Sequence, residues 1–386
     1  MKQRKTGILL ASVATTAMLA GVAAADTPIR IGVPVGLSGA NSVVAPSVVQ
    51  STELAIEQIN ANGGVLGRPL ELIVADDGSG AAGAQRAFDT LIFQRQVDAL
   101  ISMQTSAARN AGLPILSRGN VPYIYTSFYE GRSCHPNMYV NAWVPEQQVP
   151  PLVEHFSGTY EAQSYFLIGS DYSFGRGMLE FTRAYIEERG GTIVGEDYLP
   201  MDGTDWAPII SNLRASGADA IITSTAGGAP NVTLTRQLRD AGIDLPYGNL
   251  AVDEGTAASM GSVAEGIYIS ASYVTGIDTD ANRDFLAAME AHFGDELRTP
   301  NDLSVPQYEA VLAFAAAVEA AGTTETADVI EMLGEVTVEG PRGAISMSHQ
   351  RHAPLTMYLG QVTAEGAVNV IAAFDAVDPG DQCPDL

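Results

Sequence analysis

The chain has 386 residues and carries 45 acidic against 20 basic side chains, which gives a formal net charge of −25. This excess of negative charge argues strongly against a surface that binds nucleic acid or an anionic membrane. At about 150 residues per domain, the length favours two domains.

The first 25 residues have the pattern of a secretory signal peptide. A basic start at residues 1–5 is followed by an apolar run at 8–20, which is short for a membrane span. Three alanines at 23–25 form a small-residue cleavage site, so we expect cleavage after Ala25 and export to the periplasm. Both lysines lie in this segment, so the exported chain would have 17 arginines, no lysine and a net charge of −28.

The chain contains two cysteines, Cys134 and Cys383. In an exported protein, a single pair with one member close to the C-terminus suggests a disulfide that fixes the C-terminal tail. Metal ligation by two cysteines this far apart is the less favoured interpretation.

The first part of the chain alternates between apolar runs and helical patterns. Such alternation predicts a parallel, doubly wound sheet. The predicted strands are 29–35, 69–75, 98–101 and 122–126, and the predicted helices are 43–62, 85–95 and 106–118.

The pattern starts again after residue 145 and predicts a second α/β unit. Its predicted strands are 165–169, 192–199, 220–223, 247–252 and 267–272, and its predicted helices are 149–156, 177–189, 207–216 and 231–241. Helices at 284–293, 307–321 and 326–333 follow, and the chain ends in predicted antiparallel strands at 344–347, 355–362 and 368–374. We therefore expect two lobes, with the chain crossing between them more than once.

Polar residues gather where the predicted strand 98–101 meets the predicted helix 106–118. Ser102, Thr105 and Ser106 place three hydroxyls beside the free backbone N–H groups and positive dipole end of that helix. Ligands of open α/β sheets bind at the carboxyl ends of the strands, so this turn is a candidate site for a carboxylate, amide or urea oxygen. The alternative is that Thr105 or Ser106 only caps the helix.

Several patterns associated with enzymes have simpler explanations. Residues 78–83 match G-x-G-x-x-G, but they follow the second strand and two aspartates, Asp76 and Asp77, which would repel a pyrophosphate. His349 and His352 lie in a turn-like segment and are better explained as solvated side chains than as metal ligands. We therefore expect no enzyme activity, no metal and no cofactor.

The order of short motifs along the chain resembles the periplasmic solute-binding proteins of ABC importers for branched-chain amino acids, amides and urea. The similarity covers nearly all of residues 29–374. The motifs are Ile31-Gly32-Val33 with Leu37-Ser38-Gly39, the stretch 55–67, Asp76-Asp77 with Ser79, Tyr129-Glu130-Gly131, residues 145–148, Gly169-Ser170-Asp171-Tyr172 and residues 217–220.

This resemblance implies an α/β fold with two doubly wound, Rossmann-like lobes, joined by three crossover segments around a ligand cleft. Lobe 1 would comprise residues 26–142 and 276–336, lobe 2 residues 143–275 and 337–374, and the tail residues 375–386. We expect a monomer that binds a small polar ligand and delivers it to the membrane permease of an ABC importer. The alternative is an exported ligand sensor of the same fold that docks on a membrane receptor.

The resemblance also implies where the ligand binds. In lobe 1, Ser106 and the turn before it would hold the polar head of the ligand, together with Ser127. In lobe 2, Tyr172 would close over the ligand, Gly227 and Gly228 would allow close backbone approach, and Asp253 or Glu254 would accept an ammonium or amide N–H. The complete predicted set is Ser102, Gln104, Thr105, Ser106, Ser127, Tyr172, Gly227, Gly228, Asp253 and Glu254.

Overall fold

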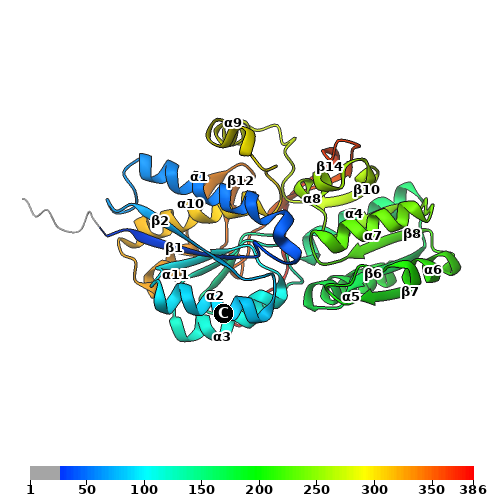
Figure 1. The fold of residues 1–386 in the computed structure, drawn as a ribbon, viewed down its shortest axis with the longest axis horizontal. Helices are drawn as coiled ribbons and strands as arrows, with labels where there is room; N and C mark the ends of the chain where they lie inside the picture. The colour runs from blue at the N-terminus through cyan, green and yellow to red at the C-terminus, as the bar shows by residue number, and fades with distance from the viewer. Residues whose placement is uncertain (1–26) are drawn as a thin grey trace, which may run out of the picture.

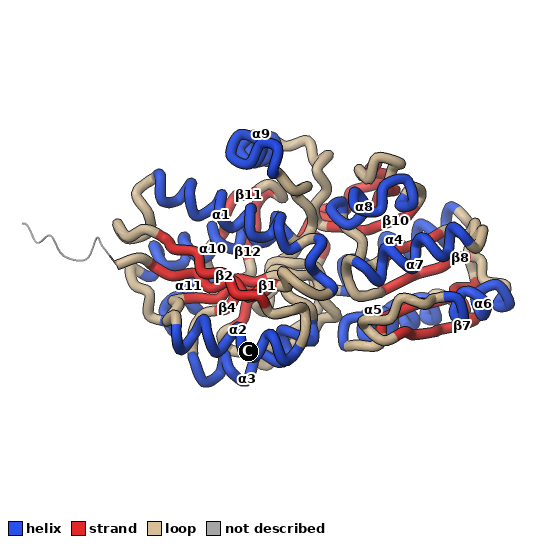
Figure 2. Tube along the Cα trace, in the orientation of Figure 1, coloured by secondary structure: helices blue, strands red, loops and turns tan. Residues whose placement is uncertain are grey.

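The computed structural model describes residues 27–386, so the predicted signal peptide lies outside the described residues. Two lobes lie side by side, each built on a sheet with helices on both faces (Figures 1 and 2). The expected architecture of two α/β lobes is therefore confirmed. None of the helices within residues 27–386 has the length and apolar character needed to cross a membrane.

The sheet of lobe 1 is parallel throughout and has the strand order β2-β1-β3-β4-β5. All seven residues of β1 except Arg30 are buried, as expected for a central strand covered on both faces. The strands are β1 (Ile29–Val35), β2 (Leu70–Asp76), β3 (Ala99–Ser102), β4 (Tyr123–Tyr125) and β5 (Met138–Val140).

The helices of lobe 1 come from both ends of the chain. They are α1 (Ala45–Ala61), α2 (Ala81–Asp89), α3 (Ser106–Gly119), α9 (Asp280–Phe293), α10 (Ser304–Ala321) and α11 (Thr326–Leu333). Helix α10 is apolar around most of its circumference and packs between α1, α11 and β3, so it is the central helix of this lobe.

The sheet of lobe 2 has the order β14-β13-β10-β9-β8-β6-β7, with β13 and β14 antiparallel at one edge. Its strands are β6 (Ser164–Ser170), β7 (Thr192–Leu199), β8 (Ala220–Ser224), β9 (Tyr247–Asn249), β10 (Ile267–Ala271), β13 (Leu355–Val362) and β14 (Val368–Val377). Its helices are α4 (Pro145–Thr159), α5 (Ser173–Glu188), α6 (Ala207–Ser216), α7 (Ala229–Asp240) and α8 (Glu254–Met260).

Most elements lie where the sequence predicts them, and the differences have local causes. Helix α4 begins four residues before its predicted start, because Pro145 at its first position needs no partner for its nitrogen and Gln147 accepts a bond from the backbone N–H of Val144. Strand β5 and helix α8 are not predicted from the sequence. The predicted strand 344–347 does not join the large sheet but pairs with an unpredicted partner in a separate hairpin, β11 (Thr337–Gly340) and β12 (Gly343–Ser346).

The chain passes between the lobes after β5, after β10 and after the β11–β12 hairpin. Strand β11 packs against α9 and α10 of lobe 1, which favours a boundary after Ser346 rather than before Thr337. At the turn of this hairpin, Arg342 forms a buried ion pair with Glu309 of α10, with 2.6 Å between Nη2 and Oε2. Arg342 also donates to the Ser272 hydroxyl and the Asn141 carbonyl, so one side chain joins two of the crossover segments to α10.

The C-terminal tail returns from lobe 2 to lobe 1. After β14, the tail reaches the loop between β4 and β5, where Cys383 forms the predicted disulfide with Cys134. Figure 1 accordingly marks the C-terminus next to α3 of lobe 1. The Gln382 side chain accepts a bond from the Arg132 backbone N–H at 2.9 Å, and the Cys383 N–H donates to Gln350 at 2.8 Å. Within residues 27–386 the tail is thus a fourth connection between the lobes.

Replacing both cysteines by serine should lower the free energy of unfolding by about 2–4 kcal/mol, because the bridge closes a loop of 249 residues and so restricts the unfolded chain. Urea unfolding of the parent and of the Cys134→Ser/Cys383→Ser variant measures this difference. The parent treated with a reductant should behave like the variant. Equal midpoints for the oxidised and reduced parent would contradict the expectation.

Candidate functional site

A cavity of about 30 Å³ lies between the lobes, at the carboxyl ends of both sheets. Seven of the ten predicted ligand-binding residues line it. Those from lobe 1 are Gln104, Thr105, Ser106 and Ser127, and those from lobe 2 are Tyr172, Gly227 and Asp253. The carboxyl-end rule for open α/β sheets therefore brings these residues together from two lobes.

The turn between β3 and α3 provides the polar wall of lobe 1. Thr105 is the N-cap of α3: its hydroxyl accepts a bond from the Ala108 N–H at 3.1 Å and donates to the Ser79 carbonyl at 3.1 Å. The capping role that the sequence left open for Thr105 is therefore present. Ser106 is the first residue of the helix, so the positive end of the α3 dipole faces the cavity.

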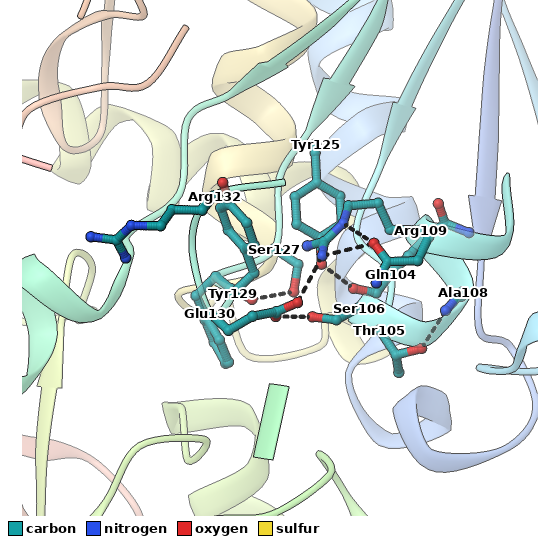
Figure 3. A network of polar contacts seen from close by, with 12 residues as sticks. Gln104, Thr105, Ser106, Ala108, Arg109, Tyr125, Ser127, Tyr129, Glu130 and Arg132 are labelled. Carbon is teal, nitrogen blue, oxygen red and sulfur yellow. Dashed lines mark hydrogen bonds and ion pairs between the residues drawn. The ribbon is translucent and has the colours of Figure 1, made fainter. Parts of the chain in front are cut away.

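Ser106 is held by a charged pair behind the cavity (Figure 3). Its hydroxyl donates to Glu130 Oε2 at 2.5 Å, and Arg109 Nη2 donates to Glu130 Oε1 at 2.9 Å. The Arg109 side chain is fully buried, with its guanidinium carbon 4.9 Å from the Tyr125 ring centre and 4.5 Å from that of Tyr129. The pair is neutral as a whole, and it fixes the direction of the Ser106 hydroxyl.

Gln104 supports the turn with its side chain. Its amide donates to Asp77 Oδ2 at 2.5 Å and accepts from the Tyr123 hydroxyl at 3.0 Å. The Tyr125 hydroxyl donates to the Gln104 carbonyl at 2.7 Å. These bonds engage both ends of the amide within lobe 1, which makes Gln104 a support for the turn.

Aromatic rings form a second wall that is not among the residues predicted from the sequence. Phe128 stacks on Trp143 with 4.2 Å between the ring centres, and Phe174 lies 5.7 Å from Phe128. Both phenylalanines line the cavity together with Tyr172. Burial raises the pKa of Tyr172 well above its ordinary value, so its hydroxyl stays protonated as a donor.

Asp253 provides a buried carboxylate on the lobe 2 side. It caps α8, accepting from the Thr256 N–H at 2.8 Å and the Thr256 hydroxyl at 3.2 Å, and it is 2% exposed. Burial raises its pKa to about 6, against the opposing effect of these bonds. A carboxylate with this degree of burial gains from a cationic or N–H donor partner, which would offset its lost hydration.

Three predicted residues lie outside the cavity lining. The Ser102 hydroxyl is buried and donates to the Pro34 carbonyl. Glu254 faces away from the cavity, where its carboxylate accepts from the Thr275 N–H at 2.5 Å and the Val368 N–H at 3.2 Å. Gly228 meets the Ala40 carbonyl of lobe 1, and a Cβ there would lie 2.2 Å from that oxygen. Its role in the structure is contact between the lobes, since it has a φ of +67° and no room for a side chain.

Further lining residues come from segments that the sequence alone marks only as loops. Asn41 lies on η1 (Ala40–Val43), between the predicted strand 29–35 and the main part of the predicted helix 43–62. Its side chain lies beside Met103, and its backbone N–H donates to Ser79 at 3.0 Å. Thr225 follows β8 at the carboxyl end of the second sheet, so the rule that found Ser106 also applies to this residue.

Comparison with known proteins places this architecture in a well-populated group. A family model described as periplasmic binding protein matches residues 28–367. The Leu/Ile/Val-binding protein homolog 7 of Brucella melitensis is 22% identical over 363 residues, which cover 87% of this chain and 88% of that protein.

Two solved structures have the same fold. One is a solute binding protein of an ABC transporter from R. palustris in complex with 4-hydroxybenzoate, with a TM-score of 0.84, 21% identity, and coverage of 92% of this chain and 99% of that one. The other is the branched-chain amino acid transporter substrate binding protein of Streptococcus pneumoniae in complex with isoleucine. Its TM-score is 0.79 at 22% identity, with 90% and 99% coverage.

Proposed function

We propose that this chain, which belongs to the periplasmic binding protein family, captures a small polar ligand in the cavity between its lobes. The protein then delivers this ligand to the membrane permease of an ABC importer. Proteins of this family bind small molecules and are not enzymes, and the family implies a periplasmic location. The ligand class that we propose is an amino acid, a short amide or a urea-like compound.

Within this class, the charges that line the cavity favour an α-amino acid. The observation that carries this choice is the opposition of charge across the cavity: the positive end of α3 lies in lobe 1, and the buried Asp253 carboxylate lies in lobe 2. The first suits a carboxylate and the second an ammonium group. Phe128 and Phe174 supply an apolar wall for an aliphatic or aromatic side chain.

Aromatic carboxylates are the second candidate, and the stacked rings at Phe128 favour them. Benzoate has a carboxylate for the α3 terminus but no donor for Asp253. It would therefore leave a buried carboxylate without a partner, which costs free energy. This difference makes the two candidates distinguishable by experiment.

A thermal unfolding screen with L-leucine, L-phenylalanine, acetamide, urea and benzoate tests the proposal. A ligand present at 100 times its dissociation constant stabilises the folded state by about 2.7 kcal/mol, so the two amino acids should raise the midpoint most. Small-angle scattering should show a smaller radius of gyration when the ligand is bound. Absence of any shift with all five compounds would overturn the proposed ligand class.

Delivery to an importer is tested in cells. Deleting the gene should abolish uptake of the radiolabelled compound that binds best, and restoring the gene should restore uptake. If uptake persists and a transcriptional or chemotactic response to the compound is lost instead, the protein is the sensor that the sequence left as the alternative.

A further inference from the structure

Glu130 lies where the two lobes meet. It follows β4 of lobe 1, and its side chain rests on the backbone of Gly177 in the first half of α5, in lobe 2. A Cβ added to Gly177 would lie 2.6 Å from the Glu130 Cβ and 3.0 Å from its Cγ. The stem of Glu130 thus fills the space that any side chain at position 177 would need.

The other end of Glu130 is fastened within lobe 1. Its two carboxylate oxygens accept from Ser106 and from the fully buried Arg109 (Figure 3). The two tyrosine rings that enclose the guanidinium leave Arg109 little freedom. Both the stem and the carboxylate of Glu130 therefore have one defined position when the lobes are closed.

The bond to Glu130 decides whether the Ser106 hydroxyl can act as a donor or as an acceptor toward a ligand in the cavity. A hydroxyl has one proton and two lone pairs. Because Ser106 donates its proton to Glu130, only lone pairs remain to face the cavity that Ser106 lines. Ser106 is thus an acceptor for a ligand N–H group, while the donors on this wall are the N–H groups of the α3 terminus.

We propose that Glu130 is a positioning residue that couples closure of the lobes to recognition of the ligand by Ser106. Gly177 is the position on lobe 2 that the Glu130 stem contacts. Water competes for the Glu130 carboxylate when the lobes are apart. Closure on Gly177 excludes that water and strengthens the bonds to Ser106 and Arg109. This inference rests on the proposed function, since it assigns a role to Ser106 in ligand binding.

The substitution Gly177→Ala tests whether closure of the lobes requires the contact between Glu130 and Gly177. Its added methyl group meets Glu130 only when the lobes close, so we expect the affinity for the best of the five screening compounds to fall at least tenfold. The melting temperature without ligand should not fall, because alanine is more favourable than glycine inside a helix. The matched control is Gly158→Ala in α4, where an added Cβ has nothing within 4 Å. Its affinity should stay within twofold of the parent.

A double-mutant cycle tests whether Glu130 is the residue that the added methyl group meets. Glu130→Gly removes the stem and the carboxylate, and we expect at least fivefold weaker binding because Ser106 loses its acceptor. The fully buried Arg109 also loses its ion-pair partner, so binding by this variant is measured well below its own melting temperature. On that background, adding Gly177→Ala should change the affinity by less than twofold, so the two substitutions should be strongly non-additive. The inference is overturned if Gly177→Ala binds as the parent does, or if it weakens binding equally with and without Glu130.

The proposed function and this inference fail in different ways. If the parent binds none of the five compounds, the proposed ligand class fails, and the role of Gly177 is then judged by small-angle scattering of the proteins without ligand. In concentrated sucrose, which favours the compact, closed form, the parent should have a smaller radius of gyration than Gly177→Ala, and the double variant should match the parent. Equal radii for the three proteins in sucrose would overturn the role of Gly177.

Discussion

Replacing Arg342 by methionine is expected to lower the free energy of unfolding by about 3–5 kcal/mol, because it leaves Glu309 buried without a partner. Glu309 has a fully buried side chain, and burial raises its pKa while Arg342 opposes this effect. The variant also loses the bonds from Arg342 to Ser272 and Asn141 that join two crossover segments to α10. Chemical denaturation at pH 7 measures the loss.

Two further measurements separate loss of the partner from loss of the arginine stem. Adding Glu309→Leu to the first substitution should recover much of the stability, since an apolar pair often replaces a buried ion pair at little cost. The deficit of the single variant should also shrink as the pH falls toward 5, because protonation of Glu309 removes the unpaired charge. The control is Arg283→Met, an exposed arginine whose ion pairs are screened by solvent, so this substitution should leave the unfolding midpoint close to that of the parent.

Replacing Asp253 by asparagine is expected to weaken binding of an amino acid by about 2–5 kcal/mol, which corresponds to roughly 30- to 5,000-fold in the dissociation constant. The substitution removes the carboxylate that faces the ligand ammonium group but keeps the cap of α8, since asparagine caps helices as well as aspartate. Calorimetry at pH 7.5 with L-leucine and L-phenylalanine measures the change. Benzoate, which has no ammonium group, should bind the variant no more weakly than the parent.

The pH dependence of the same variant provides a separate test. The pKa of Asp253 is raised to about 6, so the parent should lose affinity as the pH falls through about 6, and the variant should show no such loss. Without ligand, a raised pKa means that ionised Asp253 destabilises the fold as the pH rises from about 4 toward 6. This cost reaches up to about 3 kcal/mol at pH 7. The variant should therefore melt at a higher temperature than the parent at pH 7, while it binds more weakly. A lower melting temperature would contradict the assigned pKa.

The fold could be predicted from the sequence because long periodic segments determine it. The patterns at β7, α6 and α11 predict those elements with their observed bounds. Strand β5 and helix α8 were not found in this way, and length alone is not the cause, because β4 and β9 also have three residues each and lie within predicted strands. Contacts with the rest of the lobe decide the conformation of such short segments.

The sequence could predict the residues of the candidate site that directly follow a strand. Ser106, Ser127 and Tyr172 each follow a strand of a parallel sheet, so their convergence follows from topology. Phe128 and Phe174 are neighbours of two of these residues, but an apolar side chain in a sequence is equally consistent with the core. Asp253 and Glu254 are adjacent and chemically similar, so the sequence cannot distinguish them. In the structure, the Asp253 side chain lines the cavity, whereas the Glu254 carboxylate accepts bonds from the N–H groups of Thr275 and Val368.

The pairing of Glu130 with Gly177 was beyond any sequence pattern. The two residues lie in different lobes, and a glycine in a predicted helix indicates only a weak point in that helix. The contact explains the glycine, because the Glu130 stem occupies the space that a side chain at position 177 would need.

The disulfide between Cys134 and Cys383 has a topological consequence. The segment between the two cysteines contains every strand of the lobe 2 sheet together with α9, α10 and α11 of lobe 1. That part of the polypeptide is therefore a covalently closed ring attached to an N-terminal arm. A protease that cuts once at an exposed crossover would open the ring without separating the molecule into two pieces. In a compartment that contains proteases, a molecule cut once in this way keeps both lobes, and therefore both walls of the cavity, joined by the disulfide.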